Sequence, residues 1–182
     1  MLEQMIIAGS GGQGIQFLGQ LFMRTAVDQG LNATYLPTYG AERRGGFSFC
    51  SLVLADTQIY APVFKISDTL LAFDQRAWDE YADKVQQKGL IIINSDLIKS
   101  KEIGVKVLAL PATSLALEIK NERVINLIML GAYLSFKSTL QLDKIKITLE
   151  KLKFKSLEQQ QANLSALLKG YEFMQTEVSN DS

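Results

Sequence analysis

The chain has 182 residues, 47% of them hydrophobic, and its 19 basic residues balance its 19 acidic ones. This length and composition predict a single domain over residues 1–182 with a buried core, and the neutral charge argues against nucleic acid as a main partner, because phosphate-backbone binding needs a basic excess. The chain has no histidine and only one cysteine, Cys50. This excludes His-based catalysis, an internal disulfide, and an Fe–S cluster or Cys-rich zinc site built from this chain alone.

Strands and helices are expected to alternate through the first two thirds of the chain. In chain order, these elements are strand Met5–Ala8, helix Ile15–Gln29, strand Ala33–Leu36 ended by Pro37, strand Phe47–Ala55 and a short edge or hairpin strand Ile59–Val63. Strand Thr69–Phe73 follows and ends in Asp74-Gln75, before a helix to about Lys88 that is capped by Gly89 and strands Leu90–Ile93 and Val105–Leu110. After Pro111 the expected helices are Ala112–Glu118, Glu122–Phe136, Leu142–Leu152 and Ser156–Met174.

This order predicts an α/β fold, a three-layer α/β/α sandwich with a mainly parallel sheet and a helical C-terminal part. The Phe47–Ala55 strand follows the preceding strand without a crossover helix, so we expect an antiparallel element and a mixed sheet. The core is expected over residues 5–136, the C-terminal helices over 142–174, and a flexible tail over 176–182.

Within the helix predicted at Glu122–Phe136, the stretch Val124–Phe136 is apolar on nearly all sides, so this helix is expected to be buried on more than one side. Either it is a central helix or another subunit covers it. The apolar stretch is too short to span a bilayer, and no signal peptide is visible at the N-terminus. We therefore expect a cytoplasmic protein without membrane association.

A glycine-bearing loop follows the first predicted strand and opens the first helix, which is the context that a phosphate-binding loop requires. Its glycines match G-x-G-x-x-G, but a dinucleotide site also needs an acidic residue after the second strand, where Leu36-Pro37-Thr38 stands. The glycines either only allow close packing of helix on sheet, or the loop amides bind an anion or cofactor. The candidate binding residues are Gly9, Ser10, Gly11, Gly12, Gln13 and Gly14.

A second loop, Tyr39–Gly46, combines two arginines with a carboxylate, a tyrosine and three glycines. In a parallel α/β sheet both loops fall on the same edge, where such folds bind ligands. An arginine there offers a planar fork to a carboxylate or phosphate, whereas the alternative is a surface turn in which Glu42 pairs with one arginine. The candidate binding residues are Tyr39, Glu42, Arg43, Arg44, Gly45 and Gly46.

Other polar residues favour structural roles. Cys50 lies inside a strand and is expected to be a small buried residue and not a reactive thiol. Asp74 and the Asn94–Asp96 segment, which follow strands, are expected to be helix N-caps. A group of lysines is either the solvated face of helices or a docking surface for an acidic partner. These are Lys144, Lys146, Lys151, Lys153 and Lys155.

The two loops resemble motifs of one family. Gly-Ser-Gly-Gly-Gln-Gly at 9–14 is similar to the G-x-G-G-Q-G opening of the γ subunit or domain of 2-oxoacid:ferredoxin oxidoreductases. Tyr39–Gly46 resembles that family's Y/F-G-x-E-x-R-G-G segment. The similarity spans most of residues 5–135 and includes the Cys50 strand and Asn126…Gly131 in the late helix.

The resemblance implies one subunit of an enzyme that decarboxylates a 2-oxoacid on thiamine diphosphate and releases an acyl-CoA. It implies partner subunits that bind thiamine diphosphate or are ferredoxin-like, with ferredoxin as electron acceptor. This chain would bind no cofactor or metal alone and carry no catalytic residue; in the complex, thiamine diphosphate, Mg, Fe–S clusters and coenzyme A are expected. The chain would help to form the shared active site and contact coenzyme A, whose phosphates suit loop amides and arginines.

Details of the same motifs bear on the substrate class and favour 2-oxoglutarate over pyruvate. Tyr39-Gly, the Arg-Gly-Gly run and the following Cys50 resemble 2-oxoglutarate-type γ subunits more than pyruvate-type ones, whereas Arg43 departs toward the pyruvate pattern. Two other classes of function stay open: a stand-alone nucleotide-binding α/β enzyme, which the missing acidic residue disfavours, and a non-catalytic scaffold module.

Overall fold

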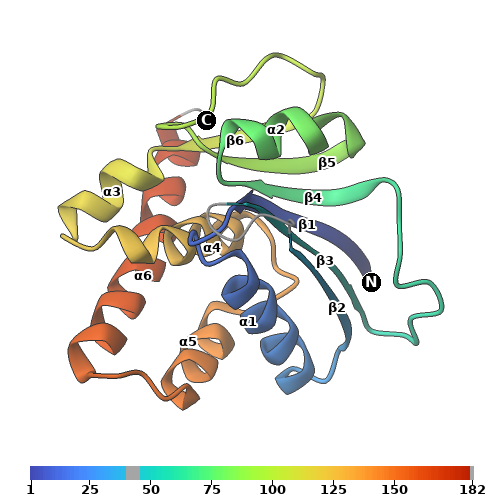
Figure 1. Cartoon of the computed structure of the whole chain (residues 1–182). Helices are drawn as coiled ribbons and strands as arrows, with labels where there is room; N and C mark the ends of the chain where they lie inside the picture. Colours follow the sequence, from blue (N-terminus) through green and yellow to red (C-terminus); the bar gives the residue numbers. More distant parts are fainter. Residues whose placement is uncertain (40–45, 181–182) are drawn as a thin grey trace.

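The computed structural model describes residues 1–39 and 46–180 of the chain, with side chains described over 1–38 and 46–176. The described residues form a six-stranded sheet with the strand order β2-β3-β1-β4-β5-β6 (Figure 1). The strands are β1 (Leu2–Ser10), β2 (Asn32–Tyr39), β3 (Phe47–Ala55), β4 (Ser67–Ala72), β5 (Val85–Asn94) and β6 (Lys106–Leu110). The α-helices are α1 (Ile15–Asp28), α2 (Gln75–Tyr81), α3 (Ala112–Glu118), α4 (Ile125–Phe136), α5 (Leu142–Lys151) and α6 (Leu157–Asn180), and the 3₁₀ turns are η1 (Ala82–Lys84) and η2 (Glu122–Val124).

The sheet is mixed, as predicted. Strands β1, β4, β5 and β6 pair in parallel, whereas β3 pairs antiparallel with both β1 and β2. The predicted end of the second strand at Pro37 is wrong, since β2 continues to Tyr39 with Pro37 opposite Cys50. An edge strand tolerates proline because one side of its backbone needs no ladder partner.

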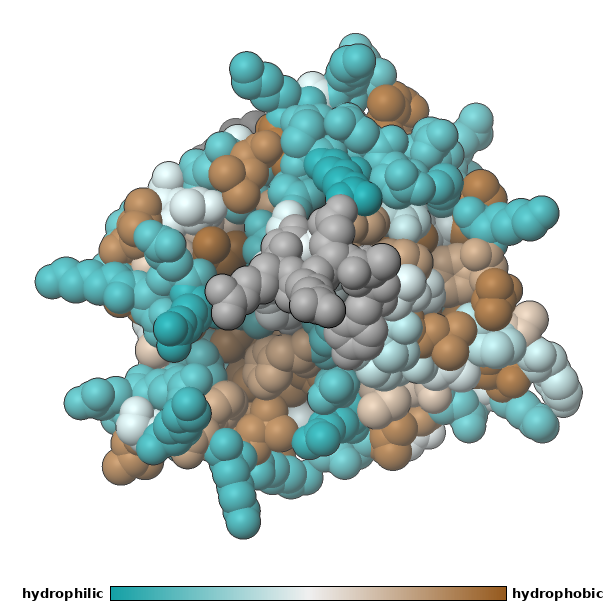
Figure 2. All heavy atoms as spheres, in the orientation of Figure 1, coloured by the Kyte–Doolittle hydropathy of each residue, from teal (hydrophilic) through white to brown (hydrophobic). Residues whose placement is uncertain are grey.

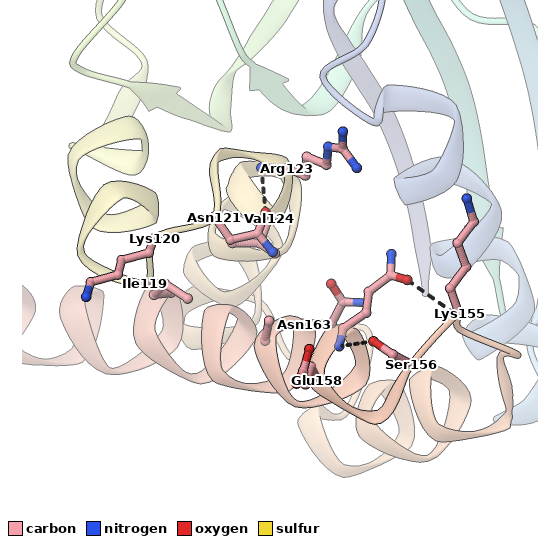
Figure 3. A pocket seen from close by; sticks show the side chains of 11 residues that line it. Ile119, Lys120, Asn121, Arg123, Val124, Lys155, Ser156, Glu158 and Asn163 are labelled. Atoms are coloured by element: carbon pink, nitrogen blue, oxygen red, sulfur yellow. Dashed lines mark hydrogen bonds between the residues drawn. The ribbon is translucent and has the colours of Figure 1, made fainter.

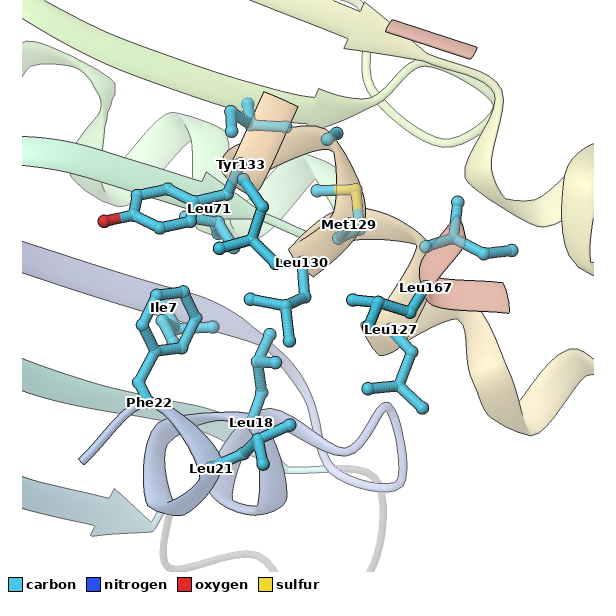
Figure 4. Packing of buried hydrophobic residues seen from close by; sticks show 14 of the residues in the cluster. Ile7, Leu18, Leu21, Phe22, Leu71, Leu127, Met129, Leu130, Tyr133 and Leu167 are labelled. Atoms are coloured by element: carbon cyan, nitrogen blue, oxygen red, sulfur yellow. The ribbon is translucent and has the colours of Figure 1, made fainter. Parts of the chain in front are cut away.

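Helices cover the two faces of the sheet unequally, which gives three layers of different thickness. One face packs on α1, α3, α4, α5 and α6 and holds the larger hydrophobic cluster, whereas α2 covers the other face with a smaller one (Figure 1). In the larger cluster, Phe22 of α1 meets Tyr133 of α4 edge to face with ring centroids 4.9 Å apart (Figure 4).

Helix α4 is the central helix of the larger layer. Every residue from Asn126 to Leu134 is buried by this chain's own elements, so the alternative that another subunit covers this helix is not needed. Helix α6 crosses α4 at a pair of glycines, where an added Cβ at Gly131 would lie 2.6 Å from the Tyr171 amide nitrogen and one at Gly170 would lie 2.7 Å from the Ile128 carbonyl carbon. The crossing therefore brings the two backbones into contact.

The strand predicted at Ile59–Val63 does not form. Tyr60 and Val63 are 86% and 73% exposed in a segment without regular structure. The prediction fails because β3 already has β1 and β2 as neighbours, so a segment that follows β3 directly cannot pair with it as a hairpin strand. A β-rich local sequence cannot form a strand without an available partner.

The helix predicted after Asp74-Gln75, to about Lys88, ends much earlier. Helix α2 stops at Tyr81, and β5 begins at Val85. Gly89 is accordingly no helix cap but a buried strand residue, where an added Cβ would lie 2.8 Å from the Asp68 carbonyl oxygen. The ladder between β4 and β5 shifts register beside it, which is a usual place for a strand glycine. At the other end of the chain, α6 continues past the predicted limit of Met174 to Asn180.

Candidate functional site

The glycine loop joins β1 to α1 at the carboxyl edge of the parallel strands. Gly12 and Gly14 have φ angles of 99° and 77°, in the left-handed region that glycine adopts without steric cost. Gly14 is also the N-cap of α1 and offers no side chain to the first helical amides. The glycines of this loop are therefore explained by a tight turn that leaves the first backbone amides of α1 without a side-chain cap.

Side chains hold this loop in shape. The backbone N–H of Ser10 donates to Gln13 Oε1 at 2.7 Å, and the Ser10 hydroxyl donates to Asp74 Oδ2 at 2.6 Å. Asp74 is the N-cap of α2, as predicted, and accepts from the Ala77 N–H at 3.0 Å. One carboxylate thus connects the ends of β1 and β4 through hydrogen bonds to the glycine loop and to the first turn of α2.

The loop offers unpaired backbone donors. Among the described residues, the N–H groups of Gly12 and Gly14 have no hydrogen-bond partner, and the first amides of α1 have none by helix geometry. No acidic residue stands in the first turn of α1. The positive end of the helix dipole is therefore uncompensated, which is the arrangement that binds phosphate at a helix N-terminus.

Three glycines of this loop, Gly9, Gly12 and Gly14, serve different purposes. An added Cβ at Gly9 would lie 2.7 Å from Phe73 Cβ, and one at Gly14 would lie 3.0 Å from Asn126 Cγ, so both permit close packing. Gly12 is exposed and has no atom within 4 Å of its added Cβ. Packing accounts for Gly9 and Gly14, and the open side of the loop lies at Gly12.

The second loop cannot be placed in the same way. Glu42, Arg43, Arg44 and Gly45 lie outside the described residues, as does the side chain of Tyr39. Their flanks are placed: the Gly11 N–H donates to the Gly46 carbonyl at 2.7 Å, and Phe47 pairs with Ser10. The ends of β2 and β3 that bracket this loop therefore lie at the same sheet edge as the glycine loop.

Gln16 connects the two loops, and the sequence contains no signal that singles it out. From the first turn of α1, its Nε2 donates to Ser48 Oγ at 2.9 Å and to the Phe49 carbonyl at 3.0 Å, and its Oε1 accepts from the Tyr35 hydroxyl at 2.7 Å. These partners belong to β2 and β3. One amide side chain thereby holds the strands that bracket residues 40–45 against the helix of the glycine loop.

Asn126 approaches the loop from α4. This residue is 5% exposed, and its Nδ2 donates weakly to the Gly14 carbonyl at 3.4 Å. An amide inside an apolar helical run was the available sequence signal for it. Because Asn126 touches the loop, the N-terminal end of α4 belongs to the same region of the molecule.

The remaining candidates have structural roles. Cys50 is buried, and burial raises the pKa of its thiol from 9.0 to about 12, so the thiolate required for reactivity is suppressed. The predicted N-cap role of Asn94 and Asp96 is wrong, since no helix follows them and the N-cap of α3 is Pro111. Their side chains instead accept from the first turn of α3: the N–H of Ala112 donates to Asn94 Oδ1 at 3.1 Å and that of Ser114 to Asp96 Oδ2 at 2.7 Å.

On the face of the molecule that Figure 2 shows, hydrophilic side chains are the most common, with apolar ones scattered among them. No helix among the described residues is both long and apolar enough to cross a membrane. Within the same residues, no three Cys, Asp or Glu side chains gather as a metal ion would require.

Comparisons with known proteins agree on one family. The family model described as pyruvate ferredoxin/flavodoxin oxidoreductase matches residues 4–173. The 2-oxoglutarate synthase subunit KorC of Methanocaldococcus jannaschii is 32% identical over 179 residues, which cover 94% of each chain. The ketoisovalerate oxidoreductase subunit VorA of Methanothermobacter thermautotrophicus is also 32% identical, over 133 residues, but this chain spans only 28% of its length.

Solved structures share the fold. The γ subunit of a keto/oxoacid ferredoxin oxidoreductase from Geobacter sulfurreducens superposes with a TM-score of 0.81 at 24% identity, covering 96% of this chain and 99% of that one. A 2-oxoglutarate:ferredoxin oxidoreductase from Magnetococcus marinus, solved with 2-oxoglutarate, coenzyme A and succinyl-CoA bound, gives a TM-score of 0.86 at 24% identity and covers 96% of this chain and 31% of that one.

Proposed function

Because this chain belongs to the pyruvate ferredoxin/flavodoxin oxidoreductase family, we propose that it is the γ subunit of a 2-oxoacid:ferredoxin oxidoreductase that converts 2-oxoglutarate to an acyl-CoA. The observation that carries the proposal is the match to 2-oxoglutarate synthase subunit KorC, which covers 94% of both chains. A match of that extent indicates an equivalent subunit and not a shared fragment.

The size of the relatives favours a role inside a larger enzyme. In subunit VorA the matching segment is 28% of a longer polypeptide, so the same fold occurs fused to further sequence. We propose that the partners of this chain are a thiamine-diphosphate-binding subunit and a ferredoxin-like subunit that carries the Fe–S clusters. Ferredoxin would accept the electrons. A cytoplasmic location belongs to the same proposal, and fractionation of cells that express the complex tests it.

The glycine loop is this chain's contribution to ligand binding in the proposal. The free N–H groups of Gly12 and Gly14, at the positive end of α1, suit a phosphate of coenzyme A. Arg43 and Arg44, whose loop joins strands that end beside the glycine loop, would add charge-assisted bonds from a second direction. Decarboxylation and oxidation of the 2-oxoacid are chemistry that thiamine diphosphate and the clusters supply when bound to the partner subunits.

Reconstitution tests the proposal. The chain is co-expressed with the neighbouring larger subunits, and ferredoxin reduction is measured with coenzyme A and either 2-oxoglutarate, pyruvate or 2-oxoisovalerate. We expect activity only when this chain is present, with the highest kcat/KM for 2-oxoglutarate. A preference for 2-oxoisovalerate would transfer the assignment to the VorA type, and full activity of a complex that lacks this chain would refute the subunit role.

A matched pair of glycine variants tests the loop. Gly12 and Gly30 both have left-handed φ angles, +99° and +83°, and neither has an atom within 4 Å of its added Cβ. Alanine therefore costs similar backbone strain at both, roughly 1–2 kcal/mol. We expect Gly12→Ala to raise the apparent KM for coenzyme A and Gly30→Ala to leave it unchanged. Equal effects of the two variants would show that the loop acts only through stability.

A further inference from the structure

Gln16 lies just after the glycine turn, and its side-chain amide has a fixed orientation. Besides Ser48 Oγ and the Phe49 carbonyl, its Nε2 lies 3.2 Å from the Thr38 carbonyl. Two of these three acceptors are backbone carbonyls, which can only accept, so the amide nitrogen must face the strands. The amide oxygen then faces the Tyr35 hydroxyl, which donates to it. Both polar atoms of the Gln16 amide are therefore engaged.

The turn from Gly11 to Gln16 is attached to β3 at both of its ends. At the first end, the Gly11 N–H donates to the Gly46 carbonyl at 2.7 Å. At the second end, the Gln16 amide donates to Ser48, which is only 7% exposed. Gly46 and Ser48 are two positions apart at the start of β3. Residues 12–15, which include the two glycines with free N–H groups, are thus held between two contacts to one strand.

Gly19 allows this attachment, because it lets α1 approach the strands closely. An added Cβ at Gly19 would lie 2.6 Å from both Cys50 Sγ and Tyr35 Cε2. A larger residue there would push α1 away from β2 and β3, one helical turn from the Gln16 side chain. Glycine is unfavourable inside a helix, so its presence here fits a need for close approach.

Another polar region lacks such an organisation. A hollow of about 550 Å³ lies between η2 and the N-terminal end of α6, where Lys120 and Arg123 extend in different directions (Figure 3). Long side chains that diverge must lose much conformational freedom before they can bind one ligand together. The donors of the glycine loop are backbone N–H groups, which cannot adjust by changing rotamer, so their position depends on whatever holds the turn.

We infer that Gln16 is a positioning residue for phosphate binding by the glycine loop. Its bonds to β3 hold the N-terminal end of α1, and with it the free N–H groups of Gly12 and Gly14, in the geometry that a phosphate needs. Donors held in place before binding give higher affinity, because less order must be created when the ligand arrives. The inference rests on the proposed function, in which this loop contacts a phosphate of coenzyme A.

The kinetic test compares Gln16→Met with Gln20→Met in the reconstituted complex. Methionine keeps the length and the helix propensity of glutamine and removes only the amide. Gln20 is the matched control, since it is exposed one turn further along α1 and its side chain has no hydrogen bond to any residue that the structure describes. We expect Gln16→Met to raise the apparent KM for coenzyme A about tenfold with unchanged kcat, and Gln20→Met to change neither.

Amide hydrogen exchange of the purified full chain gives a readout that does not depend on activity. In Gln16→Met, the peptide that covers residues 9–16 should exchange about threefold to tenfold faster, because the turn loses one of its two contacts to β3. Gly30→Ala, which lies at the other end of α1, controls for a general loss of stability. It should leave both this exchange rate and the KM for coenzyme A unchanged.

The outcomes separate the inference from the proposed function. If Gly12→Ala raises the KM for coenzyme A and Gln16→Met does not, the inference is overturned and the proposed function stands. If neither variant raises it, the loop contact to coenzyme A is refuted and the inference falls with it. Unchanged exchange of residues 9–16 in Gln16→Met, or an equal rise in KM for Gly30→Ala, would also overturn the positioning role.

Discussion

The crossing of α4 and α6 predicts a large effect from one methyl group. Gly170→Ala would place a Cβ against the Ile128 backbone, 2.7 Å from its carbonyl carbon and 2.9 Å from its Cα. Those atoms belong to a central helix and cannot rotate away as a side-chain tip can. The two helices would therefore have to separate, and the side chains on both sides of the crossing would lose contact.

Two opposing effects set the magnitude. Alanine in place of glycine inside a helix stabilises it by about 1 kcal/mol. Overpacking against a core typically costs about 1–3 kcal/mol, and contact with rigid backbone belongs at the upper end or beyond. We expect a net loss of about 2 kcal/mol, which for a chain of this size lowers the melting temperature by about 4–8 °C.

Thermal and urea unfolding followed by circular dichroism measures this loss. Gly19→Ala is a graded control: it is also a helical glycine, but its added Cβ would meet the Cys50 sulfur and Tyr35 ring atoms, both at 2.6 Å, and these are side-chain atoms. We expect it to cost less than Gly170→Ala. If Gly170→Ala raises the melting temperature, as helix propensity alone requires, the close crossing of α4 and α6 is not as described.

Three further predictions concern the loop, the buried carboxylate and alkaline pH. Arg44→Ala in the reconstituted complex should raise the apparent KM for coenzyme A or 2-oxoacid about tenfold to a hundredfold, and Arg44→Lys less, with an unchanged melting temperature; a lower melting temperature with normal kinetics would instead indicate the Glu42 ion-pair turn. Glu3 is 3% exposed and accepts from Thr69 Oγ1 at 2.7 Å and from the Tyr133 hydroxyl at 2.8 Å. Glu3→Gln should therefore lower the free energy of unfolding, measured in urea, by about 1.5–3 kcal/mol. An unchanged free energy of unfolding would contradict the importance of the Glu3 charge. Burial raises the pKa of Cys50 from 9.0 and of Tyr81 from 10.0, each to about 12, so the folded state holds protons that the unfolded state loses. The free energy of unfolding should therefore fall as pH rises from about 9 toward 12, and it should fall less steeply in Cys50→Ala. A free energy of unfolding that does not change over this pH range would contradict the prediction.

Much of the fold could be predicted because the relevant patterns are local. The apolar run of β1, the glycine turn and the amphipathic face of α1 follow one another within the first 28 residues, and each is recognisable from spacing alone. The antiparallel β3 was predictable for a similar reason, since no crossover helix separates it from β2. The N-cap at Asp74 was likewise encoded by a residue next to its helix.

The sequence by itself determined the glycine turn, the class of fold and the family motifs, because backbone conformation at glycine and hydrophobic periodicity are properties of neighbouring residues. Only the tertiary structure decided which segments find partners: both sides of β3 are already paired, so Ile59–Val63 forms no strand beside it, and Gln16 contacts two strands only when β2 and β3 fold against α1.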